Sequence, residues 1–146
     1  MAAPTAWTCY DQFKLKLGTK VMNLGSDTIK MALFTSTSNA GSASLASAIY
    51  SNLTNEVSNA NGYTTAGVTV APTWSNAAGT ETFTVANATW NATSSGITAR
   101  FAVLYDSTSG DLIAYCILDS TPADVVVSAG NSLTIQANAS GVFTLT

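Results

Sequence analysis

The chain has 146 residues and a formal net charge of −3, and only 9% of its residues are charged. It contains no histidine, which excludes a Ser-His-Asp or Cys-His catalytic arrangement and a His-ligated metal site. Two cysteines are too few for a four-thiolate zinc site or a disulfide framework, and a pI near 4.4 argues against electrostatic binding of nucleic acid. The sequence therefore predicts a protein that is not an enzyme, with no catalytic residue, no cofactor and no metal.

The composition indicates one folded globular domain. Apolar residues make up 47% of the chain and the mean hydropathy is +0.25, whereas disordered chains combine low hydrophobicity with high charge. No apolar run is long enough to span a membrane, and residues 1–7 lack the features of a secretory signal. We therefore expect synthesis in the cytoplasm, no membrane partner, and Cys9 and Cys116 made as free thiols.

The first 25 residues carry the one helical pattern. The apolar positions that share a helical face are Tyr10, Phe13, Leu17, Val21 and Leu24. Thr8 is the candidate N-cap and Gly18 a candidate end, which predicts a two-turn helix with a looser continuation.

The same segment is basic. All four lysines fall within the first 30 residues, whereas the rest of the chain has one arginine and six acidic residues. One interpretation is an arm that docks on an acidic partner surface, and the other is a helix with an ordinary solvated face. The candidate docking residues are Trp7, Tyr10, Phe13, Lys14, Lys16 and Lys20.

From residue 28 onward the apolar period changes to two. Strands are predicted near residues 28–35, 67–70, 82–85, 99–105, 112–118, 125–127, 133–137 and 142–146. Residues 36–48 indicate a long loop, and 106–111 and 138–141 predict hairpin turns. We expect a mainly β fold: an N-terminal arm or short helix over 1–25, then a single antiparallel β-sandwich or jelly-roll-like domain over 26–146.

Candidate sites for chemistry are weak. Asp106 and Asp111 flank a turn but lack the ligand spacing of a calcium loop, and Cys116 in an apolar strand is typical of an inert thiol. Glu56 and Glu81 could form an acid/base pair, yet nothing in the sequence places them together. A platform for sugars could be built from Trp7, Trp74, Trp90, Tyr50, Tyr63 and Tyr105, although burial explains these aromatic residues equally well.

Four segments, in order along nearly the whole chain, resemble small virion proteins of tailed bacteriophages. They are Tyr10–Phe13 leading through Leu24–Ser36, then 55–65, 100–106 and 112–119. The resemblance implies a capsid cement or decoration protein with a jelly-roll-like fold, located on the capsid surface of a virion that assembles in the host cytoplasm. It implies the major capsid protein as partner, binding between capsomers, and contacts between copies as a dimer or trimer.

Two further interpretations stay open: a phage tail or fibre component, and a carbohydrate-binding β-sandwich module. The sequence also predicts sheet edges that pair readily with other strands, because charges normally protect edge strands and few charges follow residue 30. Strand pairing between copies or with the capsid protein is therefore a second possible mode of binding.

Overall fold

The computed structural model describes residues 4–146, which form one α-helix, two short 3-10 turns and twelve β-strands. The helix is α1 (Asp11–Gly18), and the turns lie at Asn39–Gly41 and Tyr50–Asn52. The strands are β1 (Thr8–Cys9), β2 (Ile29–Phe34), β3 (Val68–Thr69), β4 (Pro72–Ala77), β5 (Thr80–Val85), β6 (Ala88–Asn91), β7 (Ile97–Ala99), β8 (Phe101–Asp106), β9 (Leu112–Ile117), β10 (Val125–Val127), β11 (Ser132–Ile135) and β12 (Phe143–Leu145). The predicted mainly β fold with antiparallel sheets and one helix near the N-terminus is confirmed, and the jelly-roll topology stays a prediction.

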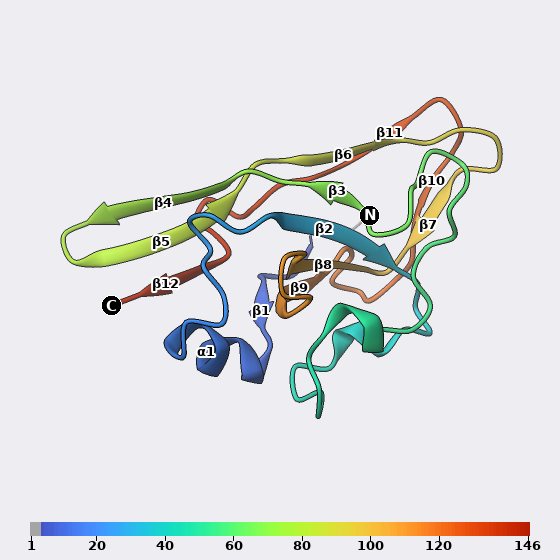
Figure 1. The fold of residues 1–146 in the computed structure, drawn as a ribbon. Helices are drawn as coiled ribbons and strands as arrows, with labels where there is room; N and C mark the ends of the chain where they lie inside the picture. The colour runs from blue at the N-terminus through green and yellow to red at the C-terminus, as the bar shows by residue number, and fades with distance from the viewer. Residues whose placement is uncertain (1–3) are drawn as a thin grey trace.

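A long antiparallel ribbon organises the fold. The chain runs out along β5, β6, β7 and β8, turns at residues 106–111, and returns along β9, β10, β11 and β12 (Figure 1). Accordingly β8 pairs with β9, β7 with β10, β6 with β11 and β5 with β12. Loops at 118–124 and 136–142 interrupt the returning strand, so the ribbon is divided into separate ladders and can bend over its own core.

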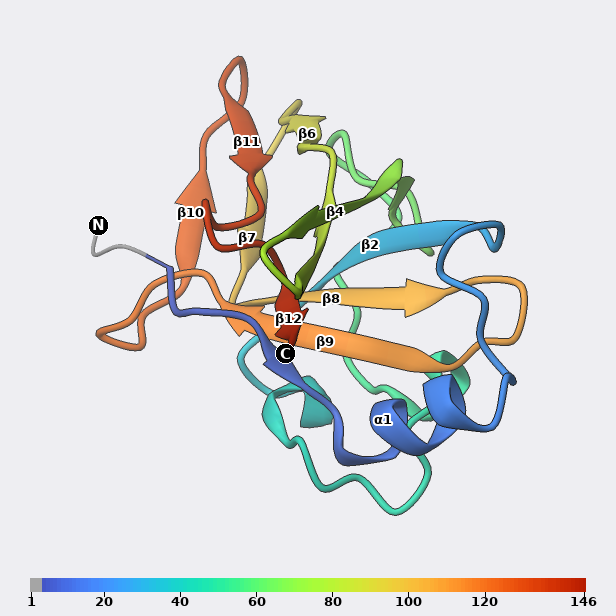
Figure 2. The same ribbon diagram turned by 90° about the vertical axis from the view of Figure 1, so that its left-hand side faces the viewer.

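The remaining strands widen this ribbon into layers. β2 joins β8 and β1 joins β9, which gives the sheet order β1-β9-β8-β2-β3, and β4 joins β5 to give β12-β5-β4. In both views the β6–β11 ladder lies above the first sheet, and α1 and the 36–57 segment lie below it (Figures 1 and 2). Hence four consecutive residues of β2, Met31 to Phe34, are at most 1% exposed, and the strand is buried on both faces rather than on the one that the sequence predicts. The second sheet also contacts α1, because the Phe143 ring of β12 lies 5.1 Å from the Phe13 ring.

Several element boundaries differ from the predicted ones. The single strand predicted over 99–105 is interrupted at Arg100, whose N–H donates to the Phe34 carbonyl and whose side chain contacts Asp124 at 2.7 Å. The chain changes sheets there, from β7 to β8. β4 was not predicted, and it begins at Pro72, where a missing N–H at an open edge costs nothing.

The second predicted hairpin is wrong as a pairing. The turn at 138–141 forms, with the Gly141 N–H donating to the Asn138 carbonyl at 2.7 Å. However, β11 pairs with β6 and β12 with β5, so the turn carries the chain from one ladder to the next. The first predicted hairpin, β8–β9, is confirmed.

The predicted two-turn helix is confirmed as α1, which ends at Gly18. It begins at Asp11, because Thr8 belongs to β1 and the N-cap residue is Tyr10, which makes no side-chain capping bond. The helical face does not continue to Val21, which is 47% exposed. Lys20 has a φ of 60°, and the chain leaves the helix there toward β2.

Candidate functional site

Two of the six predicted docking residues belong to the core. Tyr10 is 0% exposed and Phe13 is 2% exposed. The Tyr10 hydroxyl donates to the Ala40 carbonyl at 2.6 Å, and burial raises the pKa of that hydroxyl. The Phe13 ring lies 5.1 Å from the Phe143 ring. These two side chains therefore cannot contact a partner, and their assignment to a docking arm is corrected.

The N-terminal segment is also joined to the main sheet. β1 pairs with β9, with Thr8 opposite Tyr115 and Cys9 opposite Ala114. Leu24, at the end of the segment, is 2% exposed. Residues 4–25 thus share the core of residues 26–146, and we expect removal of this segment to unfold the protein rather than to release a stable β domain.

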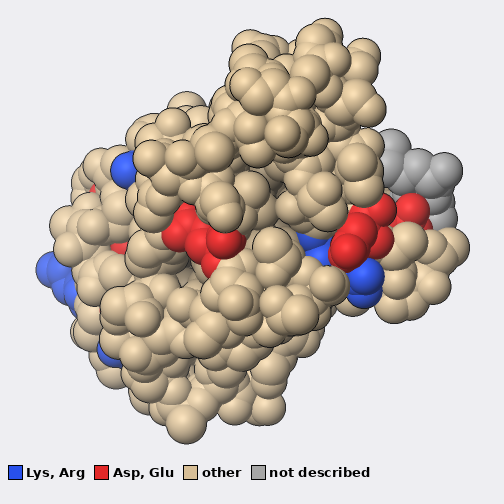
Figure 3. All heavy atoms as spheres, turned by 90° about the vertical axis from the view of Figure 1, so that its right-hand side faces the viewer, with Lys and Arg blue, Asp and Glu red and all other residues tan. Residues whose placement is uncertain are grey.

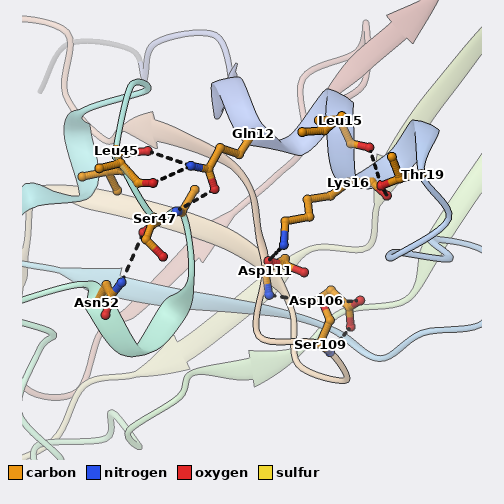
Figure 4. Close-up of polar contacts among 12 residues, drawn as sticks. Gln12, Leu15, Lys16, Thr19, Leu45, Ser47, Asn52, Asp106, Ser109 and Asp111 are labelled. Carbon is orange, nitrogen blue, oxygen red and sulfur yellow. Dashed lines mark hydrogen bonds and ion pairs between the residues drawn. The ribbon is translucent and has the colours of Figure 1, made fainter.

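The lysines of the predicted arm lie in different environments. Lys16 Nζ contacts Asp111 Oδ1 at 3.2 Å and so joins α1 to the 106–111 turn (Figure 4). Gln12 fastens the same helix to the 36–57 segment, donating to the Ala46 carbonyl at 2.6 Å and accepting from the Ala48 N–H at 3.2 Å. Lys14 and Lys20 are exposed and remain available to a partner.

Trp7 is half-buried and borders a pocket of about 360 Å³ between β9, β10 and β11. Leu118, Val125 and Leu133 contribute apolar walls, and Cys116 also lines it. Burial raises the pKa of the Cys116 thiol to about 12, and both Cys116 and Cys9 are free thiols. None of the described residues that line the pocket carries a carboxylate or an amine, so the pocket offers shape without acid/base chemistry.

A second concave surface is a groove of about 540 Å³ beside the β4–β5 hairpin, here called the hairpin groove. It is lined by Leu17, Lys20, Met22, Asn23, Leu24, Gly25, Trp74 and Glu81. Its walls are the segment that follows α1 and the inner face of the β12-β5-β4 sheet. One lysine and one glutamate border an otherwise uncharged groove.

Aromatic rings pack against one another on the inner face of the β12-β5-β4 sheet. Trp74 on β4, Phe83 on β5 and Phe143 on β12 occupy one cross-strand row. The Trp74 ring lies 5.1 Å from the Phe83 ring and 5.7 Å from the Phe143 ring, and Phe13 of α1 supports Phe143 from below. Phe83 is fully buried while Trp74 is 36% exposed. The rest of the row thus packs against Trp74 at the border of the hairpin groove.

Sequence reasoning missed the other members of this surface. Val21 and Leu145 are each 47% exposed. Val21 follows Lys20 in the chain, and Leu145 pairs with Glu81 across β12 and β5, so both adjoin groove residues. Val21 was predicted to lie on a buried helical face, and no sequence pattern brings residue 145 beside residue 81.

The predicted sugar platform does not form as one surface. Trp90, Tyr63 and Tyr105 are at most 3% exposed. Tyr63 instead donates to Glu56 at 2.6 Å, Tyr50 donates to the same carboxylate, and the Tyr50 and Tyr105 rings stack at 4.4 Å. Burial and Glu56 raise the pKa of Tyr105 to about 12. This cluster fastens the 49–67 loop to the main sheet.

The carboxylates serve local structure. Asp106 Oδ1 accepts from the Thr108 N–H at 2.7 Å, as expected for a turn-forming aspartate. Glu56 lies in the tyrosine cluster, whereas Glu81 accepts a hydrogen bond from Asn76 on the hairpin. Within residues 4–146, no group of three or more His, Cys, Asp or Glu side chains could hold a metal ion. The same part of the chain has no helix long and apolar enough to cross a membrane.

Charge is sparse over much of the surface. Figure 3 views the molecule from the side opposite the tip of the β4–β5 hairpin and shows acidic and basic groups in a few small areas of a mostly uncharged face.

Comparison with known proteins gives no relative: no family model matches the chain, and neither a curated protein nor a solved structure matches it.

Proposed function

We propose that this chain is a non-enzymatic virion structural protein, a decoration protein that binds the outer surface of a tailed-phage shell between capsomers and stabilises it. The major capsid protein is its partner. The observation that carries the proposal is the hairpin groove, a concave surface bordered by one lysine and one glutamate, whose Trp74 packs against the buried Phe83 ring. The resemblance of four ordered segments to phage virion proteins supports the same role.

A decoration protein works by covering surface rather than by chemistry. Of the five large apolar side chains that are exposed among residues 4–146, Val21, Trp74 and Leu145 surround or line the hairpin groove. Burial of such side chains against a partner contributes about 25 cal/mol per Å² of apolar area. Specific interfaces bury about 1,600 Å² in total, and repetition over a shell multiplies a modest affinity.

The groove also suggests what it receives. Lys20 and Glu81 have opposite charges and border the same groove, so the groove has no net charge that would favour a charged segment over an uncharged one with an apolar side chain. We therefore assign the groove to a loop of the shell protein that presents an apolar residue. This assignment replaces the buried Tyr10 and Phe13 as the docking surface and retains Lys20.

The first test is the copy number of this chain in purified virus-like particles, measured by quantitative mass spectrometry against the major shell protein. A ratio near one, or a simple fraction of it, supports a decoration role over the whole shell. A ratio of a few per cent would move the protein to the tail or fibre, and its absence from particles would overturn a virion role. In that last case, a change in tryptophan fluorescence on adding glycans becomes the test of a carbohydrate-binding module.

The second test examines the groove. Val21→Asp places a charge beside the hairpin groove, and Val126→Asp is the matched control, because Val126 is 68% exposed on β10 and does not line the groove. We expect Val21→Asp to weaken binding to shells stripped of this protein by at least about tenfold, as for a residue at an interface core, and Val126→Asp to bind normally. Equal binding by the two variants would place the docking surface elsewhere.

A further inference from the structure

The edge strand β4 lacks the protection that other open edges of this fold have. β4 has six residues and lies at one edge of the β12-β5-β4 sheet. Every other strand with an open side within residues 4–146 has two to four residues. Proteins protect edge strands by shortness, charge, proline or a bulge. β4 has no charged residue, its register with β5 is regular, and its proline is its first residue.

The direction of the backbone groups of β4 follows from its pairing with β5. The Ala86 N–H donates to the Ala71 carbonyl at 2.9 Å, and hydrogen-bonded positions alternate along an antiparallel strand. Thr73 and Ser75 therefore direct their backbone groups toward β5. The N–H and C=O groups of Trp74 and Asn76 point the opposite way, where the sheet has no further strand in the described chain.

We propose that β4 pairs with β4 of a second copy of this chain, antiparallel, about a two-fold axis at Ser75. In this register Trp74 lies opposite Asn76 of the second copy, and each pair exchanges two N–H···O=C bonds, which gives four across the interface. The neighbouring register, with the axis at Trp74, would place the Pro72 ring against the Asn76 carbonyl and leave that acceptor without a donor. The Ser75 register is therefore the favoured one.

A second copy suits this edge because the pairing opposes no like charges. β4 is uncharged, and Ser75 meets its own symmetry mate. The nearest carboxylate, Glu81, belongs to β5 and accepts a hydrogen bond from Asn76. Three strand spacings, about 14 Å, separate Glu81 from its mate, which exceeds the Debye length of about 8 Å at physiological salt. The product is one six-stranded sheet, isologous about the two-fold axis.

The hairpin tip supports this geometry. The turn residues Ala78 and Gly79 have φ values of 51° and 84°, as in a type I′ turn whose twist matches that of the flanking strands. The hairpin projects from the body of the molecule (Figure 1), so a second hairpin can approach its edge. The interface is small and the dimer weak, and the inference does not rest on the proposed virion role.

The test is analytical ultracentrifugation of the full chain from about 10 to about 500 µM, the range in which an interface below standard size associates. Ser75, Thr82 and Thr144 form one cross-strand row, with Ser75 on β4 and Thr144 on β12 at opposite edges of the sheet. Ser75→Lys therefore places two lysines directly opposite each other across the axis, with their Cβ atoms about 5 Å apart. Thr144→Lys adds the same charge to the same face of the sheet but at the edge far from the two-fold axis.

We expect the wild type and Thr144→Lys to dimerise with rising concentration and Ser75→Lys to stay monomeric, with unchanged circular dichroism for all three. An equimolar mixture of Ser75→Lys and Ser75→Glu should dimerise again, because opposite charges then meet at the axis. Hydrogen exchange should slow at the Trp74 and Asn76 amides on dimerisation. A wild type that stays monomeric to the highest concentration, or equal loss in both lysine variants, would overturn the proposal.

Discussion

Replacing Phe13 by alanine distinguishes a detachable N-terminal arm from a segment of the core. Phe13 is the buried residue of α1, 2% exposed, and its ring meets Phe143 edge-on at 5.1 Å. Phe→Ala at buried sites costs about 3–5 kcal/mol, from lost transfer energy and the cavity left behind. Against a typical total stability of about 5–15 kcal/mol, that loss is large. At about 4 °C per kcal/mol, the melting temperature should fall by roughly 12–20 °C.

The assay is urea unfolding followed by circular dichroism, with Leu15→Ala as the matched control on the same helix. Leu15 is 65% exposed, so its removal should change the free energy of unfolding by less than about 0.5 kcal/mol. The slope of the free energy of unfolding against urea concentration should be the same for both variants if each exposes the same surface on unfolding. A loss below about 1 kcal/mol for Phe13→Ala would refute the placement of α1 in the core.

Three other substitutions or titrations give independent checks. Lys16→Met leaves Asp111, whose side chain is 5% exposed, without its ion-pair partner. Because Lys16 is partly exposed, we expect urea unfolding to show a loss of about 1–2 kcal/mol in the free energy of unfolding, and the double variant Lys16→Met/Asp111→Asn to recover most of it. Ala78→Asn should stabilise the hairpin by about 0.5–1 kcal/mol, because asparagine tolerates the positive φ of this turn position, and an unchanged or lower stability contradicts the turn type. Burial raises the pKa of the Tyr105 hydroxyl to about 12, from about 10 when unfolded, so the stability it contributes is complete below pH 10 and is lost as the pH rises toward 12. The part of the tyrosinate absorbance that Tyr105→Phe removes should therefore appear together with unfolding, and its appearance near pH 10 in the folded protein would argue against the burial of Tyr105.

Local patterns account for what was predicted correctly. The spacing of Tyr10 and Phe13 with Gly18 downstream is enough to define a two-turn helix, because helical periodicity and a glycine end act over a few residues. Strands rich in β-branched and aromatic residues, such as β8 and β9, were likewise found from composition and alternation.

The missed strands have no such local pattern. β4 reads PTWSNA and β6 reads ATWN, small and polar sequences that become strands because β5 and β11 supply hydrogen-bond partners from elsewhere in the chain. The break at Arg100 was invisible for the same reason, since the carbonyl that accepts its N–H belongs to Phe34. Strand pairing over such separations is set by the whole fold.

The functional surface shows the same division. The low charge and the absence of histidine excluded whole classes of chemistry, because these are properties of the residues themselves. Burial decided the rest, because Tyr10 and Phe13 look like docking residues in the sequence but are covered in the fold. Trp74 lines the hairpin groove, and Val21 and Leu145 adjoin its lining residues, only because the segment after α1 lies beside the β12-β5-β4 sheet. The sequence determined the fold class and the uncharged edges. Only the tertiary structure decided which of its apolar residues are exposed, since exposure depends on contacts between segments far apart in the chain.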